Sequence, residues 1–258
     1  MKNPRPWMAA VALAAAVQLS GCSTITSFNS SRLAASTGPT TEQSDPWERM
    51  NRAVFGFNEV VDKTVIRPVA TMYRDLVPRW LRTSVDNVFG NLGDVWSTAN
   101  LMLQLKPKAA LDMGMRVATN TVFGFGGILD VADEVGLEKH SEDFGQTLAY
   151  WGVSSGPYLV LPLLGPSTLR DGTARILDSR YAPDRLAFRE VRDRNSAFAL
   201  EALQVRVNLL NASRVLDDVA LDKYVFLRDA YLARRRNQVY DGEPPEEKTP
   251  EPAAPPTK

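Results

Sequence analysis

Hydrophobic and polar residues follow a helical period over most of the chain. From Trp47 to Val61 the apolar positions recur at spacings of three and four, and Glu48 and Arg52 form an i, i+4 pair outside that stripe. This spacing gathers apolar side chains on one face of an α-helix. Similar runs continue to about residue 238, and no alternating strand pattern is sustained. The sequence therefore predicts a mainly α protein, in which Trp47 and Met50 serve core packing.

Prolines, glycines and capping residues mark the expected helix ends. Asp45-Pro46-Trp47-Glu48 predicts an N-cap at Asp45, followed by proline in the first helical position. That helix should end near Pro68, and Gly124 should take a left-handed conformation after a later helix. The remaining helices are expected over 69–75, from Pro78 with an interruption at Gly90 and Gly93, from Pro107 to 122, over 128–135, within 183–211 and over 224–238.

One apolar stretch has neither a helical nor an alternating period. Residues 158–164 are Tyr-Leu-Val-Leu-Pro-Leu-Leu, and Pro157, Pro162 and Pro166 lie beside or within them. Proline is excluded from the interior of a helix and from central strands. We therefore expect an extended apolar loop held by prolines.

The first residues have the order of a bacterial lipoprotein signal. Lys2 and Arg5 precede an apolar run over residues 7–17, which is followed by Leu19-Ser20-Gly21-Cys22. The run is shorter than the roughly 20 residues of a spanning helix. Cys22 is the only cysteine, so no disulfide is expected. We expect cleavage after residue 21, lipid attachment to Cys22 and, because no acidic residue follows, delivery to the outer membrane.

Composition then divides the rest of the chain. Residues 22–44 have the polar composition of a flexible tether, 45–240 form one expected helical domain, and 241–258 are a proline- and glutamate-rich tail expected to be disordered. The 258 residues include 30 basic and 30 acidic side chains, and the two signs are interleaved. This balance argues against nucleic acid as a partner.

Motifs of catalysis are weak. Gly152-Val153-Ser154-Ser155-Gly156 matches the serine hydrolase string, but a proline and an irregular apolar run follow it, and the only histidine, His140, precedes it. Gly124-Phe125-Gly126 lacks the third glycine of a dinucleotide site. One histidine and a lipidated cysteine do not make a metal site. We expect no enzymatic activity, no cofactor and no metal.

The charged residues of the chain have a structural interpretation. Glu138, Glu142, Asp143 and the adjacent pairs Arg74-Asp75, Arg170-Asp171 and Arg228-Asp229 are read as solvated or structural ion pairs rather than acid and base pairs. Residues 234–236 are three arginines near the end of the last expected helix, where cations interact favourably with the helix dipole. A site for a lipid headgroup or a partner is the alternative for these arginines.

A series of short motifs follows in order between residues 45 and 240. They are Asp45-Pro46-Trp47-Glu48 with Asn51-Arg52, Arg67-Pro68-Val69-Ala70, Tyr73-Arg74-Asp75-Leu76-Val77-Pro78, Asn120-Thr121, Gly124-Phe125-Gly126-Gly127, Asp143-Phe144-Gly145-Gln146-Thr147-Leu148, Trp151-Gly152-Val153, Gly156-Pro157-Tyr158, Leu161-Pro162, Gly165-Pro166-Ser167-Thr168-Leu169-Arg170-Asp171 and Arg228-Asp229-Ala230-Tyr231. In this order they are similar to the MlaA (VacJ) family of outer-membrane lipoproteins. The tether and the tail carry no such motif.

The resemblance implies a helical, ring-like protein in the inner leaflet of the outer membrane, on its periplasmic face, around an amphipathic channel. It implies removal of phospholipids misplaced in the outer leaflet, and thereby maintenance of lipid asymmetry. The implied partners are phospholipid, a trimeric porin and a soluble periplasmic lipid carrier. The implied transport is not an enzymatic reaction and needs no cofactor.

A phospholipid path needs apolar walls for acyl chains beside polar groups for the headgroup. We expect the path to be lined or bordered by Phe123, Phe125, Tyr158, Leu159, Leu161 and Leu163, with Phe55, Phe57 and Trp96 facing acyl chains at the membrane edge. Glycines that permit close approach and movement are expected at Gly126, Gly127, Gly156 and Gly165. Plain interior packing is the alternative for each position. For the whole protein, the alternative is a structural lipoprotein that docks porins without conducting lipid.

Overall fold

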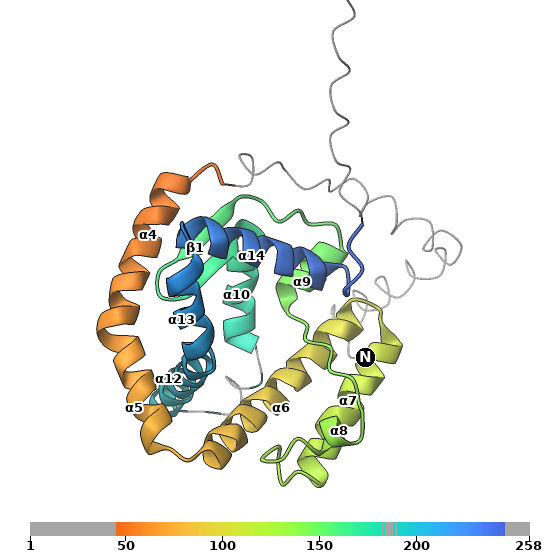
Figure 1. Cartoon of the computed structure of the whole chain (residues 1–258). Coiled ribbons are helices and arrows are strands. Elements are labelled where there is room, and N and C mark those ends of the chain that lie inside the picture. Colours follow the sequence, from red (N-terminus) through yellow and green to blue (C-terminus); the bar gives the residue numbers. More distant parts are fainter. Residues whose placement is uncertain (1–44, 182, 184–187, 189, 246–258) are drawn as a thin grey trace, which may run out of the picture. The chain divides into compact units, whose positions relative to one another are not determined.

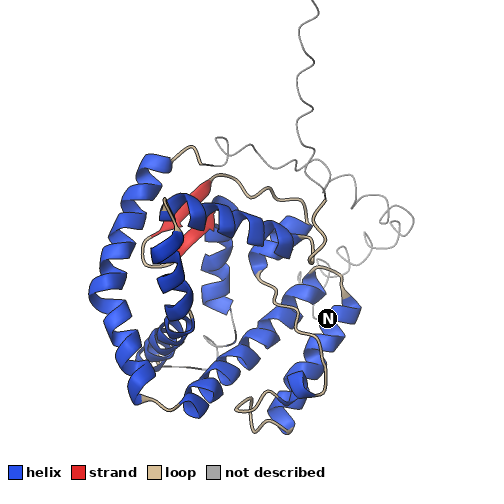
Figure 2. Ribbon diagram, viewed as in Figure 1, coloured by secondary structure: helices blue, strands red, loops and turns tan. Residues whose placement is uncertain are grey.

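Helices make up most of the chain that this computed structural model describes, namely residues 45–181, 183, 188 and 190–245 (Figures 1 and 2). The described helices and strands all lie in one compact unit, residues 39–244. The expected signal peptide (1–21), the lipidated Cys22 with its tether (22–44) and the tail beyond residue 245 lie outside the described residues.

The mainly α class predicted from the sequence is confirmed. In chain order the elements are α4 (Glu48–Val61), the π-helical turn η2 (Asp62–Ile66), α5 (Arg67–Leu76), α6 (Arg79–Leu103), α7 (Pro107–Val122), α8 (Val131–Glu134), α9 (Phe144–Tyr150), β1 (Tyr158–Leu161), β2 (Gly165–Thr168), α10 (Leu169–Tyr181), α12 (Val191–Asn208), α13 (Leu210–Val219) and α14 (Lys223–Val239).

The start of α4 differs from the prediction. The helix begins at Glu48 with Trp47 as its N-cap residue, and no side chain caps it. The carboxylate of Asp45 is buried instead, where it accepts hydrogen bonds from the amide of Asn51 at 2.7 Å and from the hydroxyl of Tyr224. The predicted N-cap was therefore wrong, because Asp45 joins α4 to α14 rather than capping a helix.

Two predicted helix breaks are absent. Pro68 lies in the first turn of α5, and η2 connects α4 to α5 without interruption. A π-turn is wider than an α-turn, which gives room for the proline ring that would otherwise clash with the preceding turn. Gly90 and Gly93 lie inside α6, which is continuous over 25 residues. Glycine costs a helix only about 1 kcal/mol, and α6 packs along α7 through Leu101 and Met113.

The expected apolar loop is a β-hairpin. β1 and β2 pair antiparallel, with Tyr158 opposite Thr168 and Leu161 opposite Gly165. A two-stranded sheet consists only of edges, so Pro166 can lie in β2 without removing a bond that a central strand would need. Leu163 in the turn and Gly165, the first residue of β2, have positive φ, 64° and 78°.

Further differences occur at glycines and at the end of the chain. Positive φ begins at Phe125 and continues through Gly126 and Gly127, whereas Gly124 is not left-handed. Gly124 is needed for space, since a Cβ there would lie 2.2 Å from the carbonyl oxygen of Leu129. The periodic run expected within 183–211 forms α12, and α13 after it was not predicted, whereas α14 was predicted to within one residue.

Contacts between the elements close a circuit within this unit. α4 leads through η2 to α5, α5 contacts α12, α12 contacts α6, α6 contacts α9, α9 contacts α10, α10 contacts β1, and β1 returns to α4 (Figure 1). The ring-like arrangement is therefore confirmed. Among the described residues no single large core fills it, because the buried apolar residues form separate small clusters between α5 and α12, between α6 and α7, and between β1 and α14. No described helix is both long and apolar enough to cross a bilayer.

Candidate lipid-binding site

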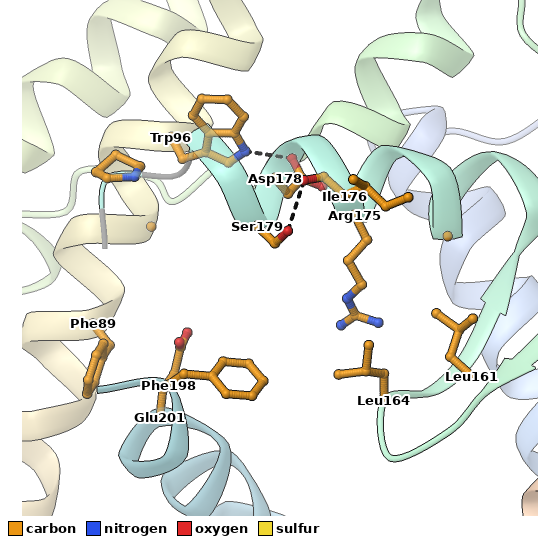
Figure 3. Close-up of a pocket in the computed structure, with 13 residues that line it drawn as sticks. Phe89, Trp96, Leu161, Leu164, Arg175, Ile176, Asp178, Ser179, Phe198 and Glu201 are labelled. Carbon is orange, nitrogen blue, oxygen red and sulfur yellow. Dashed lines mark hydrogen bonds between the residues drawn. The ribbon is translucent and has the colours of Figure 1, made fainter. Parts of the chain in front are cut away.

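Within this unit α6, α10, α12 and the β-hairpin surround an apolar cavity of about 580 Å³. Its walls have an aromatic side formed by α6 and α12 and an aliphatic side formed by the hairpin and α10 (Figure 3). Each helix contributes residues spaced by three or four positions, so one face of each helix points inward. The large apolar lining residues are Phe89, Trp96, Leu161, Leu164, Ile176 and Phe198.

A second cavity of about 330 Å³ adjoins the first, and the two share Phe89, Gly93, Trp96 and Glu201 in their walls. The second cavity is far more polar. Its charged and amide side chains are Asp86, Asp94, Lys139, Glu142, Glu201 and Gln204. Together the cavities place an apolar compartment beside a polar one, which is the division that an amphipathic ligand requires.

Hydrogen bonds hold the wall between α6 and α10 in place. The indole of Trp96 donates to Asp178 at 2.8 Å, and the backbone amide of Phe144 donates to the same oxygen at 3.2 Å (Figure 3 shows the first bond). Burial raises the pKa of Asp178 above its ordinary value, although both hydrogen bonds act in the opposite direction.

Ion pairs and an amide hydrogen bond hold two carboxylates of the polar cavity, Asp94 and Glu142, in place. Asp94 lies 3.1 Å from the amine of Lys139 and 3.6 Å from the guanidinium of Arg116, whose side chain is 1% exposed. Glu142 accepts a hydrogen bond from Gln104 at 2.8 Å, and burial raises the pKa of its carboxyl group. Asp94 is thus neutralised by cations, while Glu142 is held by a neutral amide.

Of the expected path residues, Trp96 and Leu161 line the apolar cavity. Leu163 is exposed at the hairpin turn, one residue before the lining residue Leu164. Leu159 is half-buried on β1 and does not line either cavity.

Three other expected residues lie around α4. Tyr158 is 1% exposed and packs against Tyr224, away from both cavities. Phe55 is half-buried, with its ring 5.7 Å from that of Tyr224 in an edge-to-face contact. Phe57 is exposed on α4. Tyr158 is thus packed in the interior, which was the alternative stated for each position, whereas the side chain of Phe57 is not covered by any described residue.

The predicted residues between α7 and α8 form an exposed apolar loop. Phe123 and Phe125 are both exposed, and Phe125 is 76% exposed in a left-handed conformation with φ 52°. Gly126 and Gly127 continue at positive φ, and Gly156, shortly before β1, and Gly165, the first residue of β2, share that conformation. None of these residues lines the described cavities.

Several lining residues were not predicted. Phe89 and Phe198 fall in helical apolar runs, so the periodic pattern marks them as inward-facing but does not separate a cavity wall from a core. Arg175 and Ile176 belong to α10, whose sequence Leu-Arg-Asp-Gly-Thr-Ala-Arg-Ile-Leu has no clean apolar stripe. Nothing in the sequence alone distinguished Arg175 from the other arginines.

The adjacent charged pairs form ion pairs, as predicted. The guanidinium nitrogens of Arg74, Arg170 and Arg228 lie 2.8, 2.9 and 2.9 Å from the carboxylates of the aspartates that follow them. Of the three arginines 234–236, Arg235 is buried and binds Asp143 and Asp171, so its role is an internal ion-pair cluster rather than the helix end.

Ser154 lies in an exposed loop between α9 and β1. A nucleophile elbow requires a sharp turn from a strand into a helix, and here a helix precedes the serine and a strand follows it. His140 lies 3.8 Å from Glu138. The local geometry of Ser154 therefore gives no support to a hydrolase.

Comparison with known proteins decides the family. The sequence profile of the MlaA lipoprotein matches residues 43–238. The chain belongs to the MlaA lipoprotein family. It is 34% identical over 196 residues to the intermembrane phospholipid transport system lipoprotein MlaA of Escherichia coli K12, covering 74% of this chain and 77% of that protein. It is 29% identical over 235 residues to the MlaA protein of Haemophilus influenzae, with 90% of each chain covered.

A solved MlaA-type structure, described as a structural basis for the maintenance of bacterial outer membrane lipid asymmetry, has the same fold. It superposes with a TM-score of 0.67 at 32% sequence identity and covers 78% of this chain and 100% of that chain. The chain therefore shares the family profile over residues 43–238 and, over 78% of its length, the arrangement of helices of that solved structure.

Proposed function

We propose that this MlaA-family protein is an outer-membrane lipoprotein whose amphipathic channel removes misplaced phospholipids from the outer leaflet and passes them to a soluble periplasmic carrier. The proposal includes lipid attachment at Cys22, a position beside a trimeric porin and transport without covalent chemistry. The observation that carries it is the apolar cavity of about 580 Å³ with a polar cavity beside it. Ligand sites typically enclose about 300–1,000 Å³, so this pair suits a headgroup and the upper part of its acyl chains.

The outer surface supports seating in a leaflet. α4, α5 and α7 expose large apolar side chains that no described element covers, and soluble monomers rarely expose large contiguous apolar patches. On α7 the exposed residues Leu111, Met115 and Val122 fall at helical spacing and continue into Phe123 and Phe125. An amphipathic helix of this kind lies in a membrane interface with its apolar face buried.

The first experiment is deletion of the protein in its host, followed by labelling of outer-leaflet phospholipid. A transporter predicts a rise in that phospholipid, and the wild-type chain restores the normal level. A porin-docking scaffold that conducts no lipid predicts no rise.

The second experiment changes the path itself. Leu161→Asp puts a charge into the apolar cavity wall, and we expect it to block clearance in the deletion strain while the protein remains folded and lipidated. The matched control is Leu163→Asp, because Leu163 is exposed two residues away and does not line the cavity. Normal clearance by the Leu161→Asp variant would remove Leu161 from the path. Ser154→Ala should leave clearance unchanged, and its loss in a folded variant would favour an enzyme.

A further inference from the structure

The corner where α5 turns into α6, residues 74–82, carries a group of arginines (Figure 1). Arg74 lies at the end of α5, and Arg79 and Arg82 lie in the first turn of α6. The side chain of Arg82 folds back over the corner, since its Nε donates to the carbonyl oxygen of Val77 at 3.1 Å. The helix dipole disfavours cations in a first turn, and no acidic residue lies in that turn of α6. Helix stability therefore does not account for these two arginines.

A fourth arginine reaches the corner from α13. Leu210, the first residue of α13, packs in one cluster with Ala70 and Tyr73 of α5. Arg214 follows Leu210 by about one helical turn, so it lies on the same side of α13, and it is exposed. The packing of α13 on α5 therefore brings Arg214 toward the end of α5.

Asp75 is the carboxylate within the corner, and it is already engaged. It accepts a hydrogen bond from Arg74 at 2.8 Å. That bond holds the pKa of Asp75 below its ordinary value, and the charges of Arg214 and Arg82 act in the same direction. The arginines of α5, α6 and α13 are thus close enough to act on one carboxylate.

The charges of the corner do not cancel. No carboxylate in the part of the chain that the structure describes forms an ion pair with Arg79, Arg82 or Arg214. Asp86 follows one turn after Arg82, but it accepts from the neutral amide of Gln204 at 2.8 Å and lines the polar cavity inside the unit. The outer surface of the corner therefore keeps an excess of positive charge, which an anionic partner would balance.

Apolar side chains beside the arginines indicate what kind of partner this is. Val69, Met72 and Leu76 recur at spacings of three and four on α5 and are all exposed, Leu76 by 75%. Trp80 follows in the first turn of α6 and is 70% exposed. Tryptophan is enriched at the level of lipid headgroups, and long cationic side chains reach from apolar surroundings to that level. The stripe and the corner together have the pattern of a helix that passes from acyl chains to headgroups.

We propose that the α5/α6 corner is an interfacial site for anionic phospholipids, in which Arg79, Arg82 and Arg214 bind headgroup phosphates and the ring of Trp80 lies among the glycerol groups. The planar guanidinium matches the geometry of a phosphate. A zwitterionic lipid carries its own cation and balances the arginines less well. The inference rests on the proposed function for the seating of the body in a leaflet and goes beyond it, because it names the lipid class that this edge selects.

The test uses the lipidated full-length protein, reconstituted in phosphatidylcholine vesicles, and the quenching of tryptophan fluorescence by lipids with brominated acyl chains. The probes are brominated phosphatidylglycerol and brominated phosphatidylethanolamine at equal mole fractions. The difference between the wild type and Trp80→Phe isolates the emission of Trp80. We expect phosphatidylglycerol to quench this emission at a lower mole fraction than phosphatidylethanolamine does.

Variants test the arginines. Arg79→Gln combined with Arg214→Gln should lower the preference for phosphatidylglycerol at least about tenfold, since one arginine near an anionic surface contributes about fivefold. The corresponding double lysine variant should retain part of the preference. The matched control, Arg192→Gln combined with Arg234→Gln, removes two exposed arginines of α12 and α14 and should keep the preference. Melting temperatures confirm that each variant is folded.

Three results would overturn the inference. The first is equal quenching of Trp80 by the two lipids in the wild type, or an unchanged preference in the double glutamine variant. The second is no quenching by either lipid, which would put the corner outside the membrane and favour an acidic soluble protein as its partner. The third is loss of the preference in inorganic phosphate at an ionic strength where sodium chloride preserves it, which would favour a site for free phosphate.

Clearance in the deletion strain separates this inference from the function beneath it. If the wild type restores clearance but shows no preference for phosphatidylglycerol, the interfacial site is overturned and the transport function stands. If deletion raises no outer-leaflet phospholipid while the preference depends on the arginines, the transport function is overturned and the interfacial site stands.

Discussion

Asn51 is a fully buried amide that joins three parts of the fold. Its nitrogen donates to Asp45 at 2.7 Å and to the carbonyl of Tyr158 at 3.1 Å, and its oxygen accepts from the backbone amide of Val160 at 2.9 Å. Two donors and one acceptor are thus used at one position in α4. Only a side-chain amide presents both kinds of group in this geometry.

We predict that Asn51→Leu lowers the free energy of unfolding by at least about 2 kcal/mol, because buried backbone groups of β1 lose their partners at about 1–3 kcal/mol each. Urea denaturation of the full chain measures this change. Arg49→Leu, at an exposed position on the same helix, should stay within about 0.5 kcal/mol of the wild type. Equal stability of the two variants would contradict the role of Asn51.

Arg235 is the centre of a buried ion-pair cluster. Its guanidinium nitrogens lie 2.6 Å from Asp143 and 2.9 Å from Asp171, so α14 is tied to the start of α9 and to α10. Burial alone would raise the pKa of both carboxyl groups, but the hydrogen bonds and charge of Arg235 outweigh it and hold each pKa below the ordinary value. A lowered pKa in the folded state stabilises the fold above the unfolded pKa and loses that effect as the pH falls through the folded value.

We predict that Arg235→Leu destabilises the protein by about 3–5 kcal/mol at pH 7, because two carboxylates lose their buried partner. The stability difference between wild type and variant should shrink as the pH falls below about 4, where aspartates become protonated. Thermal unfolding between pH 3 and pH 7 measures both effects. Arg234→Leu is the control, since Arg234 is exposed beside it. A difference that stays constant with pH would exclude the ionic origin.

Residue-level prediction from the sequence succeeded where partners are adjacent. Arg170 and Asp171 are neighbours, so their ion pair follows from local reach alone. Asp143 is 92 positions from Arg235, and only the folded chain brings them together. Arg175 was missed for a related reason, because an arginine in a cavity wall is recognised by what surrounds it, and its surroundings come from three other elements.

The loop between α7 and α8 shows how two neighbouring glycines serve different purposes. Gly126 and Gly127 both have positive φ, 76° and 93°. A Cβ at Gly126 would meet no atom within 4 Å, whereas one at Gly127 would lie 2.8 Å from the Cβ of Asn91 on α6. Gly126 is thus required only by its conformation, and Gly127 also by the close approach of the loop to α6.

We predict that Gly126→Ala costs about 1–2 kcal/mol, the usual penalty of a left-handed non-glycine residue. Gly127→Ala should cost measurably more, because the steric contact with Asn91 adds to the same penalty. Urea denaturation of the two variants side by side gives the comparison. A larger effect at Gly126 would contradict the close packing of this loop on α6.

The type of an element could be predicted where the helical period was long. The predicted helix boundaries were wrong where tertiary contacts override local sequence signals. The hairpin was missed because Pro162 and Pro166 argue against a central strand, while a two-stranded sheet has no central strand. The hydrogen-bond partners of its backbone are distant in the sequence. Asn51 accepts from the backbone amide of Val160 in β1, and Asn58 accepts from the backbone amide of Leu163 at 2.8 Å. No local pattern reports such contacts.

At the scale of the whole unit, apolar residues are divided between an inner cavity and an outer surface, with only small cores between them. The sequence shows this as broad apolar helix faces, and helical periodicity marks a face as apolar without stating what covers it. For α6 one such face meets α7 and another lines the cavities. For α7 the remaining apolar stripe is left exposed, and under the proposed function the lipid leaflet covers it.

If the body is embedded in this way, the lipid on Cys22 is only one of two attachments. We predict that Cys22→Ser, expressed with a cleavable signal, weakens outer-membrane retention only partly. Adding Leu111→Glu and Val122→Glu, both on the exposed stripe of α7, should release the protein into the soluble periplasmic fraction. The reason is that a charged side chain in the apolar part of a bilayer costs roughly 2.5–3.5 kcal/mol.

Fractionation of periplasm and outer membrane, with the folded state verified by thermal unfolding, measures retention. The matched control adds the same two charges at exposed polar positions of α12 and α13, Ser196→Glu and Asn211→Glu, in the Cys22→Ser background. This control should remain partly membrane-bound, because neither position belongs to the apolar stripe. A fully soluble Cys22→Ser protein would leave the acyl anchor as the sole attachment and count against an embedded body, and with it against a channel that draws lipid directly from the leaflet.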